Sequence, residues 1–341
     1  MIAKVDVSVN LCTYNRKEML RKTLRSLVQQ ETDGRFSFEI VVIDDASTDG
    51  TSAVVEEISR GSEIKIKYIK EGGKGEANSR NRAVRESIGD WVALIDDDEV
   101  PEPCWLKELV AKAFDQKADC IGGRMKLILP TNLDSKIIGT ARKQLGETAQ
   151  TSKFKKKLTW NGPGGGNALV NKKVFDHVGG FDTSMVYGGT DQDFFRRARR
   201  IGYTFAHAHN AVAYHIIPSY RLEPSYLRLT SRRNGKDLAY FDLRENGIAT
   251  LLLTCSARLV HAAAITLPRL ICARITNNEA ELMSRRCSLW TVESYTRQTL
   301  FMLFPSVFPQ KAFFGSLNNL EFRDIITVYR KNDEACRQRV Q

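Results

Sequence analysis

The chain has 341 residues, 42% of them apolar, and a formal net charge of +11 at pH 7. This length suits one large domain or one domain with an appendage, and the apolar content excludes a disordered chain. The basic balance favours anionic partners such as nucleotides or anionic lipid surfaces. The basic residues are scattered and lack aromatic interleaving, so we expect no nucleic-acid partner.

The seven cysteines are widely spaced and include no Cys-x-x-Cys pair, which argues against a zinc ribbon and favours free thiols in a reducing cytosol. No apolar signal segment follows the N-terminus. We therefore expect a cytoplasmic protein.

Strand-like and helical patterns alternate along the first half of the chain. The patterns predict strands at 5–11, 38–43, 64–69 and 91–95, and helices at 16–30, 49–58, 76–87 and 103–115. This alternation predicts an α/β fold with a doubly wound, mostly parallel sheet. Ligands bind such sheets at the carboxyl ends of the strands. Polar clusters follow three of these strands, so we expect them to meet at one edge.

The next segments read less regularly, and strand signals fade beyond about residue 218. They predict a strand at 120–129, a loop or helix at 135–158, a glycine-rich turn at 162–167, helices at 172–178 and 191–201, and a strand at 203–217. We place a domain boundary between 218 and 246. The expected organisation is a catalytic domain over 1–220 and a helical region over 221–341.

Four consecutive acids, Asp96, Asp97, Asp98 and Glu99, directly follow an apolar strand. Like charges this close repel one another and raise each other's pKa. A divalent cation relieves that cost, and carboxylates suit Mg²⁺ or Mn²⁺. The alternative is a solvated acidic turn. The sequence favours the metal site.

Asp44 and Asp45 follow another apolar strand, where a carboxylate could bind a base or a ribose. The same residues also suit a turn or a helix cap. The glycines and lysine of 72–75 precede a helix and suit a diphosphate, although a plain loop explains them equally well.

Asp191 and His215 have ordinary structural explanations when each is taken alone. Asp191 lies at a helix start, where an acid is a favourable cap. If its carboxylate projects into a cleft, it could instead accept a proton from a hydroxyl. His215 lies on an apolar strand and becomes informative only as a metal ligand beside Asp98.

Seven motifs in order resemble the family 2 inverting glycosyltransferases, which have the GT-A fold. They lie at 9–16, 42–51, 78–81, 93–98, 165–167, 179–182 and 190–193, within a resemblance that spans about 5–215. Each motif is weak alone, but their order is specific. The family more often has Glu-Asp where this chain has Thr190-Asp191, which puts in doubt any acceptor contact made by that glutamate.

The resemblance implies a role for each matching residue. The donor-binding set would be Thr13, Tyr14, Asp45, Asn78, Arg80 and Asp97, with Thr13, Tyr14 and Asp45 on the uracil and ribose. Asp96 and Asp98 look like the Asp-x-Asp motif, and together with His215 they would form the site for Mn²⁺ or Mg²⁺, with Asp98 reaching the ion. Asp191 would be the catalytic base.

The implied activity is a metal-dependent, inverting transfer of a sugar from a UDP-sugar, or another nucleotide diphosphate sugar. The acceptor would be a hydroxyl of a glycan or a lipid-linked oligosaccharide, in cell-surface or exopolysaccharide synthesis. One alternative is a sugar nucleotidyltransferase, although the basic glycine-rich loop typical of that class is absent at 13–16. A catalytically dead binding scaffold is the other, against which Asp98 and Asp191 argue.

The C-terminal third mixes apolar and basic residues. Segment 226–235 is a basic helix that could contact an acceptor phosphate, and 248–275 is apolar but interrupted by Arg258, His261 and Arg269. We expect those residues to make it too short for a spanning helix. The pattern suits either a helical subdomain or an amphipathic helix on an anionic membrane. The second reading predicts a peripheral protein on the cytoplasmic face.

Overall fold

The computed structural model describes residues 6–130, 133–148, 162–185 and 189–308. They divide into two compact units. The first unit contains the described residues up to 128 and from 148 to 216, and the second contains 129–147 and those from 217 onward. The division into domains at residue 220 stays a prediction.

The first unit is built on an eight-stranded sheet with the order β3-β2-β1-β4-β7-β6-β8-β5. The strands are β1 (Val7–Thr13), β2 (Phe38–Asp44), β3 (Ile66–Lys70), β4 (Trp91–Asp96), β5 (Glu99–Pro101), β6 (Cys120–Ile128), β7 (Asn167–Asn171) and β8 (Phe205–Ile216). Its helices are α1 (Lys17–Leu27), α2 (Thr51–Arg60), α3 (Glu76–Glu86), α4 (Trp105–Gln116), α6 (Lys172–Val178) and α7 (Thr190–Arg200).

Most strand pairs are parallel, which confirms the predicted α/β class. Strands β3, β2, β1 and β4 run parallel to one another, and β6 runs parallel to β8. Strand β7 is antiparallel to both β4 and β6, and it pairs Asn167 with Ile95. This reversal places the start of β7 beside the carboxyl end of β4. The glycine-rich turn before β7 therefore lies at the same edge as the acids after β4.

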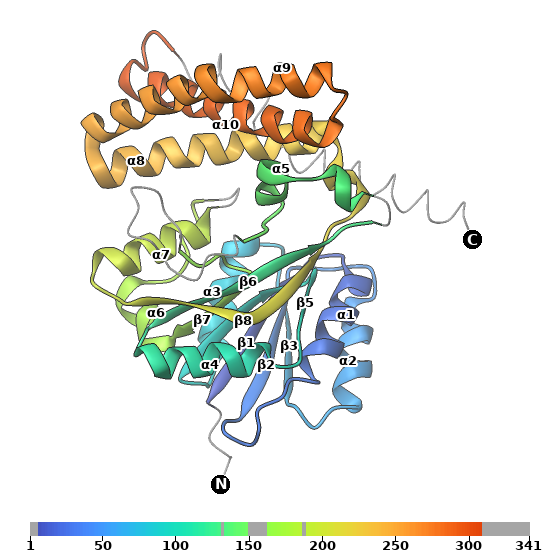
Figure 1. Cartoon of the computed structure of the whole chain (residues 1–341). Helices are drawn as coiled ribbons and strands as arrows, with labels where there is room; N and C mark the ends of the chain where they lie inside the picture. Colours follow the sequence, from blue (N-terminus) through green and yellow to red (C-terminus); the bar gives the residue numbers. More distant parts are fainter. Residues whose placement is uncertain (1–5, 131–132, 149–161, 186–188, 309–341) are drawn as a thin grey trace. The chain divides into compact units, whose positions relative to one another are not determined.

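Helices cover both faces of the sheet (Figure 1). On β4, Ala93 and Ile95 pack into a cluster with α1, α2 and α4. Val92 and Leu94 point to the other face, into a cluster with α3, α6 and α7. A strand covered on both faces reads as a continuous apolar run, as this one does. Each fully buried large side chain stabilises the fold by about 1.5–3 kcal/mol.

Helix α6 is the element whose ends the sequence predicts best. The side chain of Asn171 accepts a hydrogen bond from the Lys173 N–H at 3.1 Å and caps the first turn. Gly179 has φ 79° and ends the helix, since residues with a β-carbon rarely adopt that backbone conformation. The predicted helix at 172–178 is confirmed.

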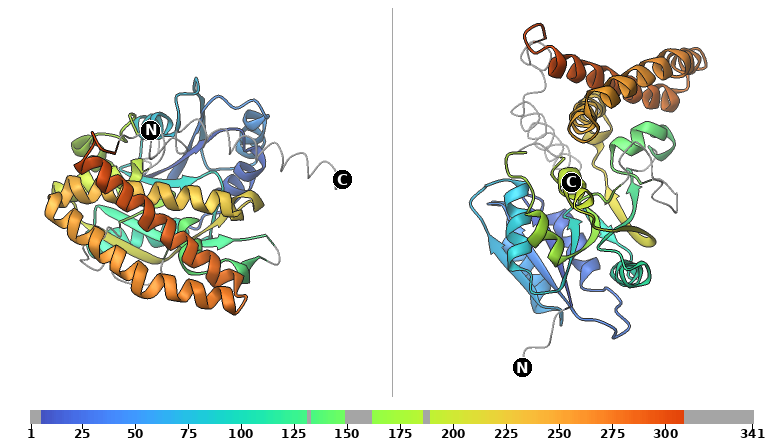
Figure 2. Two further views of the ribbon diagram at one scale, coloured as in Figure 1. Left: turned by 90° about the horizontal axis from the view of Figure 1, so that it is seen from above. Right: turned by 90° about the vertical axis from the view of Figure 1, so that its left-hand side faces the viewer.

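The second unit is helical. Its elements are η1 (Asp134–Lys136), α5 (Gly139–Gln144), η2 (Ser219–Leu222), α8 (Pro224–His261), η3 (Ala262–Thr266), α9 (Leu267–Ile275) and α10 (Glu279–Leu303). Helix α10 packs along α8 and α9, and Figure 2 shows these helices together. The buried Tyr295 hydroxyl donates to Asp242 at 2.7 Å and ties α10 to α8.

One prediction for these segments is confirmed in its described part, and another is wrong. The loop or helix predicted at 135–158 contains α5, while 149–158 lies outside the described residues. The interrupted apolar segment at 248–275 was expected to be too short to span a membrane. The helical stretch Pro224–Ile275, which has a kink at Gly247, is instead long and apolar enough to do so by length and composition alone. The reason is that the basic residues are too far apart to break up an 18-residue apolar window.

Candidate active site

Three loops meet at the carboxyl edge of the sheet. The Asp45 N–H donates to the Thr13 carbonyl at 2.9 Å, joining the loops after β2 and β1. The Thr13 hydroxyl donates to Asp97 at 2.7 Å, joining the loop after β1 to that after β4. Because parallel strands end on the same side, the polar clusters lie together as the sequence indicates.

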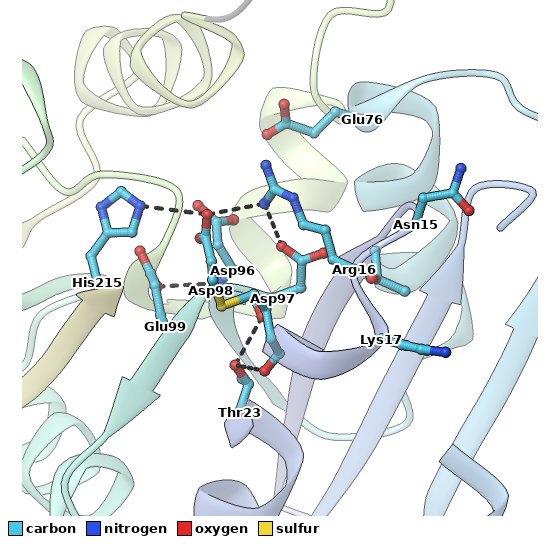
Figure 3. A network of polar contacts seen from close by, with 12 residues as sticks. Asn15, Arg16, Lys17, Thr23, Glu76, Asp96, Asp97, Asp98, Glu99 and His215 are labelled. Atoms are coloured by element: carbon cyan, nitrogen blue, oxygen red, sulfur yellow. Dashed lines mark hydrogen bonds and ion pairs between the residues drawn. The ribbon is translucent and has the colours of Figure 1, made fainter. Parts of the chain in front are cut away.

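An arginine that sequence reasoning did not single out holds two of the acids. Arg16 Nη1 lies 2.7 Å from Asp97 Oδ1 and 3.0 Å from Asp98 Oδ2 (Figure 3). Both carboxylates are buried. A buried carboxylate is costly unless it is paired, so Arg16 is what lets these two lie side by side. The sequence signal that could have pointed to Arg16 is its position beside Asn15, in a motif at the end of a strand.

The environment opposes ionisation at two acids of the run. Burial raises the pKa of Asp97; Arg16 works against this rise and Asp98 adds to it. Burial also raises the pKa of Glu99 well above its usual range, and Asp96 and Asp98 add to that. Sequence reasoning counted Glu99 among the acids but gave it no role. Groups so crowded favour a bound cation.

Asp98 and His215 come together across two strands. Asp98 Oδ2 lies 3.5 Å from His215 Nε2, and the Ile216 N–H donates to the Asp98 carbonyl at 2.9 Å. Within the described ranges, no three His, Cys, Asp or Glu side chains are placed to hold a metal. The pair still fits Mn²⁺ or Mg²⁺, because such ions commonly take one or two protein ligands and complete their shell with substrate phosphates.

Asp96, the third residue of the predicted metal site, is paired with an arginine. Its Oδ1 accepts from Arg80 at 2.8 Å, and the same Arg80 nitrogen bonds Glu76 at 2.8 Å. Burial opposes the charge of Arg80, but Glu76, Asp96 and Asp191 outweigh it and raise the pKa of the guanidinium. The guanidinium also lies over the ring of Phe181, 5.7 Å from its centroid. Arg80 therefore joins the acids after β4 to the start of α7.

Two of the other predicted donor residues, Asp45 and Asn78, contact the loop before α3. One oxygen of Asp45 accepts from the Gly75 N–H at 3.0 Å, and its other oxygen is buried without a hydrogen-bond partner. Asn78 donates to the Lys74 carbonyl at 2.8 Å, within its own first turn. The Tyr14 ring is 49% exposed. A buried acceptor without a partner leaves Asp45 ready for an N–H or O–H of a ligand.

Asp191 is fixed by the glycine-rich turn. Its Oδ2 accepts from the Gly165 N–H at 2.9 Å. At the next residue, a β-carbon on Gly166 would come within 2.2 Å of Glu99 and 2.8 Å of Asp96. Only glycines let this turn approach the acids so closely. The structure thus brings Asp191, Arg80 and Asp96 to one place.

Two asparagines connect segments of the chain that form the site. The sequence analysis named them only as parts of motifs. Asn81 accepts from the Phe181 N–H at 2.7 Å and donates to the Phe181 carbonyl at 2.8 Å. Asn167 accepts from the Trp105 indole N–H at 2.8 Å. Each amide joins segments far apart in sequence, and periodicity cannot reveal such pairs.

Comparison with known proteins decides the family. The family model described as "Glycosyl transferase family 2" matches residues 8–179, which is half of the chain. The chain belongs to glycosyl transferase family 2. A second model, "N-terminal domain of galactosyltransferase", matches residues 147–218 of this family 2 chain. Together the two matches cover every residue of the site described above.

Curated relatives of this family 2 chain include a glycosyltransferase and a hyaluronan synthase. It is 26% identical over 209 residues to "Glycosyltransferase AglE" of Haloferax volcanii, covering 61% of this chain and 66% of that protein. It is 27% identical over 271 residues to "Hyaluronan synthase" of Pasteurella multocida, covering 71% of this chain and 27% of that protein. The family 2 chain therefore spans less than two thirds of both relatives.

Solved structures support the GT-A fold of the family 2 chain. A mannosyltransferase from Pyrobaculum calidifontis, in complex with GDP-Man and Mn²⁺, superposes with a TM-score of 0.60 at 17% identity, covering 86% of this chain and 88% of that one. Residues 1–349 of Staphylococcus aureus TarS, in complex with UDP, give 0.50 at 19% identity, covering 88% and 91%.

Proposed function

We propose that this chain transfers a sugar, with inversion, from a nucleotide diphosphate sugar to a hydroxyl of a glycan or lipid-linked acceptor in polysaccharide synthesis. The observation that carries the proposal is the convergence of Asp98, His215 and Asp191 on one edge of the sheet. A uracil nucleotide is the donor to test first. The protein would work peripherally at the cytoplasmic face of a membrane. Family membership favours this transferase over the nucleotidyltransferase and scaffold alternatives.

The donor would bind along the ends of β1, β2 and β4. The unpartnered oxygen of Asp45 would accept a hydrogen bond from the base or ribose, with Thr13, Tyr14, Asn78, Arg80 and Asp97 around it. A relative named for poly(ribitol-phosphate) β-N-acetylglucosaminyl transfer and its UDP-bound structure support a UDP-sugar, while the mannosyltransferase bound to GDP-Man keeps guanine in the test panel.

Asp98 and His215 would hold Mn²⁺ or Mg²⁺, with Asp96 close by. When bound, such an ion supplies Lewis-acid stabilisation of the leaving diphosphate, worth several kcal/mol. The Mn²⁺ in the mannosyltransferase structure supports this choice.

Asp191 would act as the general base. The hydrogen bond from Gly165 orients its carboxylate, and the remaining lone pairs can accept the proton of the acceptor hydroxyl. The acceptor oxygen forms a bond to the anomeric carbon while the bond to the diphosphate breaks on the opposite face, so one displacement inverts the configuration. A positioned base of this kind contributes about 10²–10⁴-fold in rate.

The test combines calorimetry with turnover. Titration of UDP, GDP and other nucleoside diphosphates, with and without Mn²⁺, should show Mn²⁺-dependent binding of one nucleotide that Asp98→Ala abolishes. Asp191→Asn should bind the donor normally while release of nucleoside diphosphate falls by about 10²–10⁴-fold.

The matched control is Asp115→Asn, which removes the same charge from an exposed position on α4. It should turn over like the wild type. Unchanged turnover of Asp191→Asn would refute the base assignment, and no binding of any nucleoside diphosphate would refute the donor site.

A further inference from the structure

The end of α8 and the helices after it bury mainly small side chains and expose large ones. From Gly247 to Ile275 the buried residues are Leu251, Cys255, Ala262, Thr266 and Ala273. They repeat every four or seven residues, so they form one seam, and this stretch packs on α10. Five large apolar residues there are more than half exposed: Ile248 (55%), Leu253 (71%), Val260 (67%), Ile271 (56%) and Ile275 (76%). By helical spacing Leu253, Val260, Ile271 and Ile275 fall on the side opposite the seam, and we call these four the apolar face.

A helix on the surface of a soluble domain shows the opposite arrangement, with its large apolar residues inward. A contiguous exposed apolar surface marks a site of interaction. The change in character comes at Gly247, where φ is 76° and the helix is broken. Before this break α8 is rich in charged residues, and Arg232, for example, pairs with Glu293 of α10 at 2.8 Å.

The charges on this stretch have one sign. No Asp or Glu occurs between Glu245 and Glu279, whereas the stretch contains Arg258, His261, Arg269 and Arg274. Arg258 lies over the Tyr295 ring, 4.7 Å from its centroid. Arg269 and Arg274 are exposed. An apolar face accompanied only by cations is complementary to a surface that is apolar inside and anionic outside.

We propose that the apolar face is a docking surface for an anionic lipid bilayer. Its four side chains enter the boundary between headgroups and acyl chains, and Arg269 and Arg274 lie at the level of the phosphates. This gives a defined surface to the peripheral membrane contact, and it rests on that part of the proposed function alone.

The helices lie on the bilayer and do not cross it. The seam of α8, η3 and α9 packs on α10, which carries ion pairs between Glu281 and Arg285 at 2.6 Å and between Glu293 and Arg297 at 2.9 Å. A spanning arrangement would bring these charged side chains into the hydrocarbon, where charged groups are strongly disfavoured. Only the outward face can insert.

A second copy of the chain fits this surface less well. In a two-fold symmetric dimer the same patch packs on itself. Arg269 and Arg274 would then approach their own copies with no acid in the stretch to compensate them. Like charges brought together across an interface oppose association, whereas an anionic bilayer attracts them.

The test is sedimentation of the full chain with lipid vesicles. Wild-type protein should bind phosphatidylcholine vesicles that contain phosphatidylglycerol more tightly than pure phosphatidylcholine. The variant Leu253→Ser/Val260→Ser/Ile271→Ser should lose at least about tenfold in partition. The variant Arg269→Gln/Arg274→Gln should lose about fivefold per arginine on the anionic vesicles alone. The matched control, Ile88→Ser/Phe114→Ser/Ile201→Ser, removes three exposed apolar residues of the first unit and should bind as the wild type does.

Three results would overturn the proposal. The first is equal vesicle binding by the wild type and the serine variant. The second is a dimer in light scattering that the serine variant converts to a monomer, without vesicle binding by either. The third is resistance of the bound protein to alkaline carbonate extraction, which would indicate a spanning helix.

Calorimetric donor binding, measured on every variant, separates this proposal from the donor site. A variant that binds donor but not vesicles has lost the surface and kept its fold. If the wild type binds vesicles but does not bind the donor, only the proposed donor site is refuted. If the serine variant does not fold, the Arg269→Gln/Arg274→Gln variant provides the test. If it binds anionic vesicles as tightly as the wild type does, the charge contribution is refuted.

Discussion

The backbone N–H of Gly165 donates a hydrogen bond to Asp191 Oδ2 at a distance of 2.9 Å. This contact links the turn before β7 to the first turn of α7, and it orients the carboxylate that we propose as the base. The position of Gly165 depends on the antiparallel course of β7, which brings its first residue beside the end of β4.

We therefore expect Gly165→Ala to reduce kcat by at least about tenfold. The new β-carbon would lie 2.6 Å from Arg80 Nη1 and 3.0 Å from the Asp191 β-carbon, so both side chains must move. Gly164→Ala is the control, because nothing lies within 4 Å of the β-carbon added there. Steady-state turnover of the two variants is the measurement. Equal kcat values would show that the position of Asp191 does not depend on this turn.

Asn81→Ala should lower the free energy of unfolding by about 1–3 kcal/mol. The amide of Asn81 bonds both the N–H and the carbonyl of Phe181, and its removal leaves two backbone groups without a partner. Urea unfolding measures the change. Arg85→Ala, at an exposed position on the same helix, controls for the loss of a side chain and should be nearly neutral. A neutral Asn81→Ala would mean that water replaces both bonds.

Arg16→Gln should lower the melting temperature, and added Mn²⁺ should restore part of the loss. The guanidinium neutralises two buried carboxylates, Asp97 and Asp98, and a cation bound there would do the same. Removing one partner of a buried pair costs about 3–5 kcal/mol, and less here because Arg16 is 24% exposed. Thermal melting with and without Mn²⁺ is the measurement.

The control for Arg16→Gln is Arg21→Gln, which breaks an ion pair with the exposed Glu57. It should change little, with or without the ion. An equal Mn²⁺ response in both variants would argue against a metal near Asp98.

Stability should fall as the pH drops from about 6.5 to about 4, partly through His207. Burial lowers the pKa of His207 to about 4, and the neighbouring His209 adds to the shift. Between these values the unfolded chain binds a proton that the folded chain does not, so folding becomes less favourable as the pH falls. Above pH 6.5 both states are neutral at this residue and the effect vanishes.

His207→Gln removes that titration. Its free energy of unfolding should decline less steeply with acid than that of the wild type, by about 1–2 kcal/mol after allowance for partial exposure. Urea unfolding at a series of pH values from about 7 down to about 4 compares the two. Parallel curves would show that His207 is solvated in the folded state.

Sequence patterns predicted the first four strands and the helices between them, because each is long enough to show its own periodicity. The same patterns missed β5 and β7. Strand β5 has three residues, within the acidic run, and β7 begins directly after glycines. Such short elements form because neighbouring strands supply their hydrogen bonds. The pattern of a short sequence window does not show that pairing.

The candidate site divides in the same way. The acids after β4 and the base candidate Asp191 are visible as unusual residues at strand and helix ends. The roles of Arg16, Asn81 and Gly165 are not, because each acts through a contact with a residue at least 26 positions away. Asp96 and Asp98 look equivalent in the motif, yet Asp96 pairs with Arg80 while Asp98 lies beside His215.

The sequence by itself determined the α/β class, the family resemblance and the side of the sheet where the site lies. The succession of strands and helices along the chain, together with the residue types at their ends, suffices for these conclusions, because parallel strands must end on a common edge. Only the tertiary structure decided which side chains pair at that edge and that the second unit turns large apolar residues outward. Those outcomes depend on packing between segments distant in sequence, since a helix pattern shows that one face is apolar but not which face its neighbours cover.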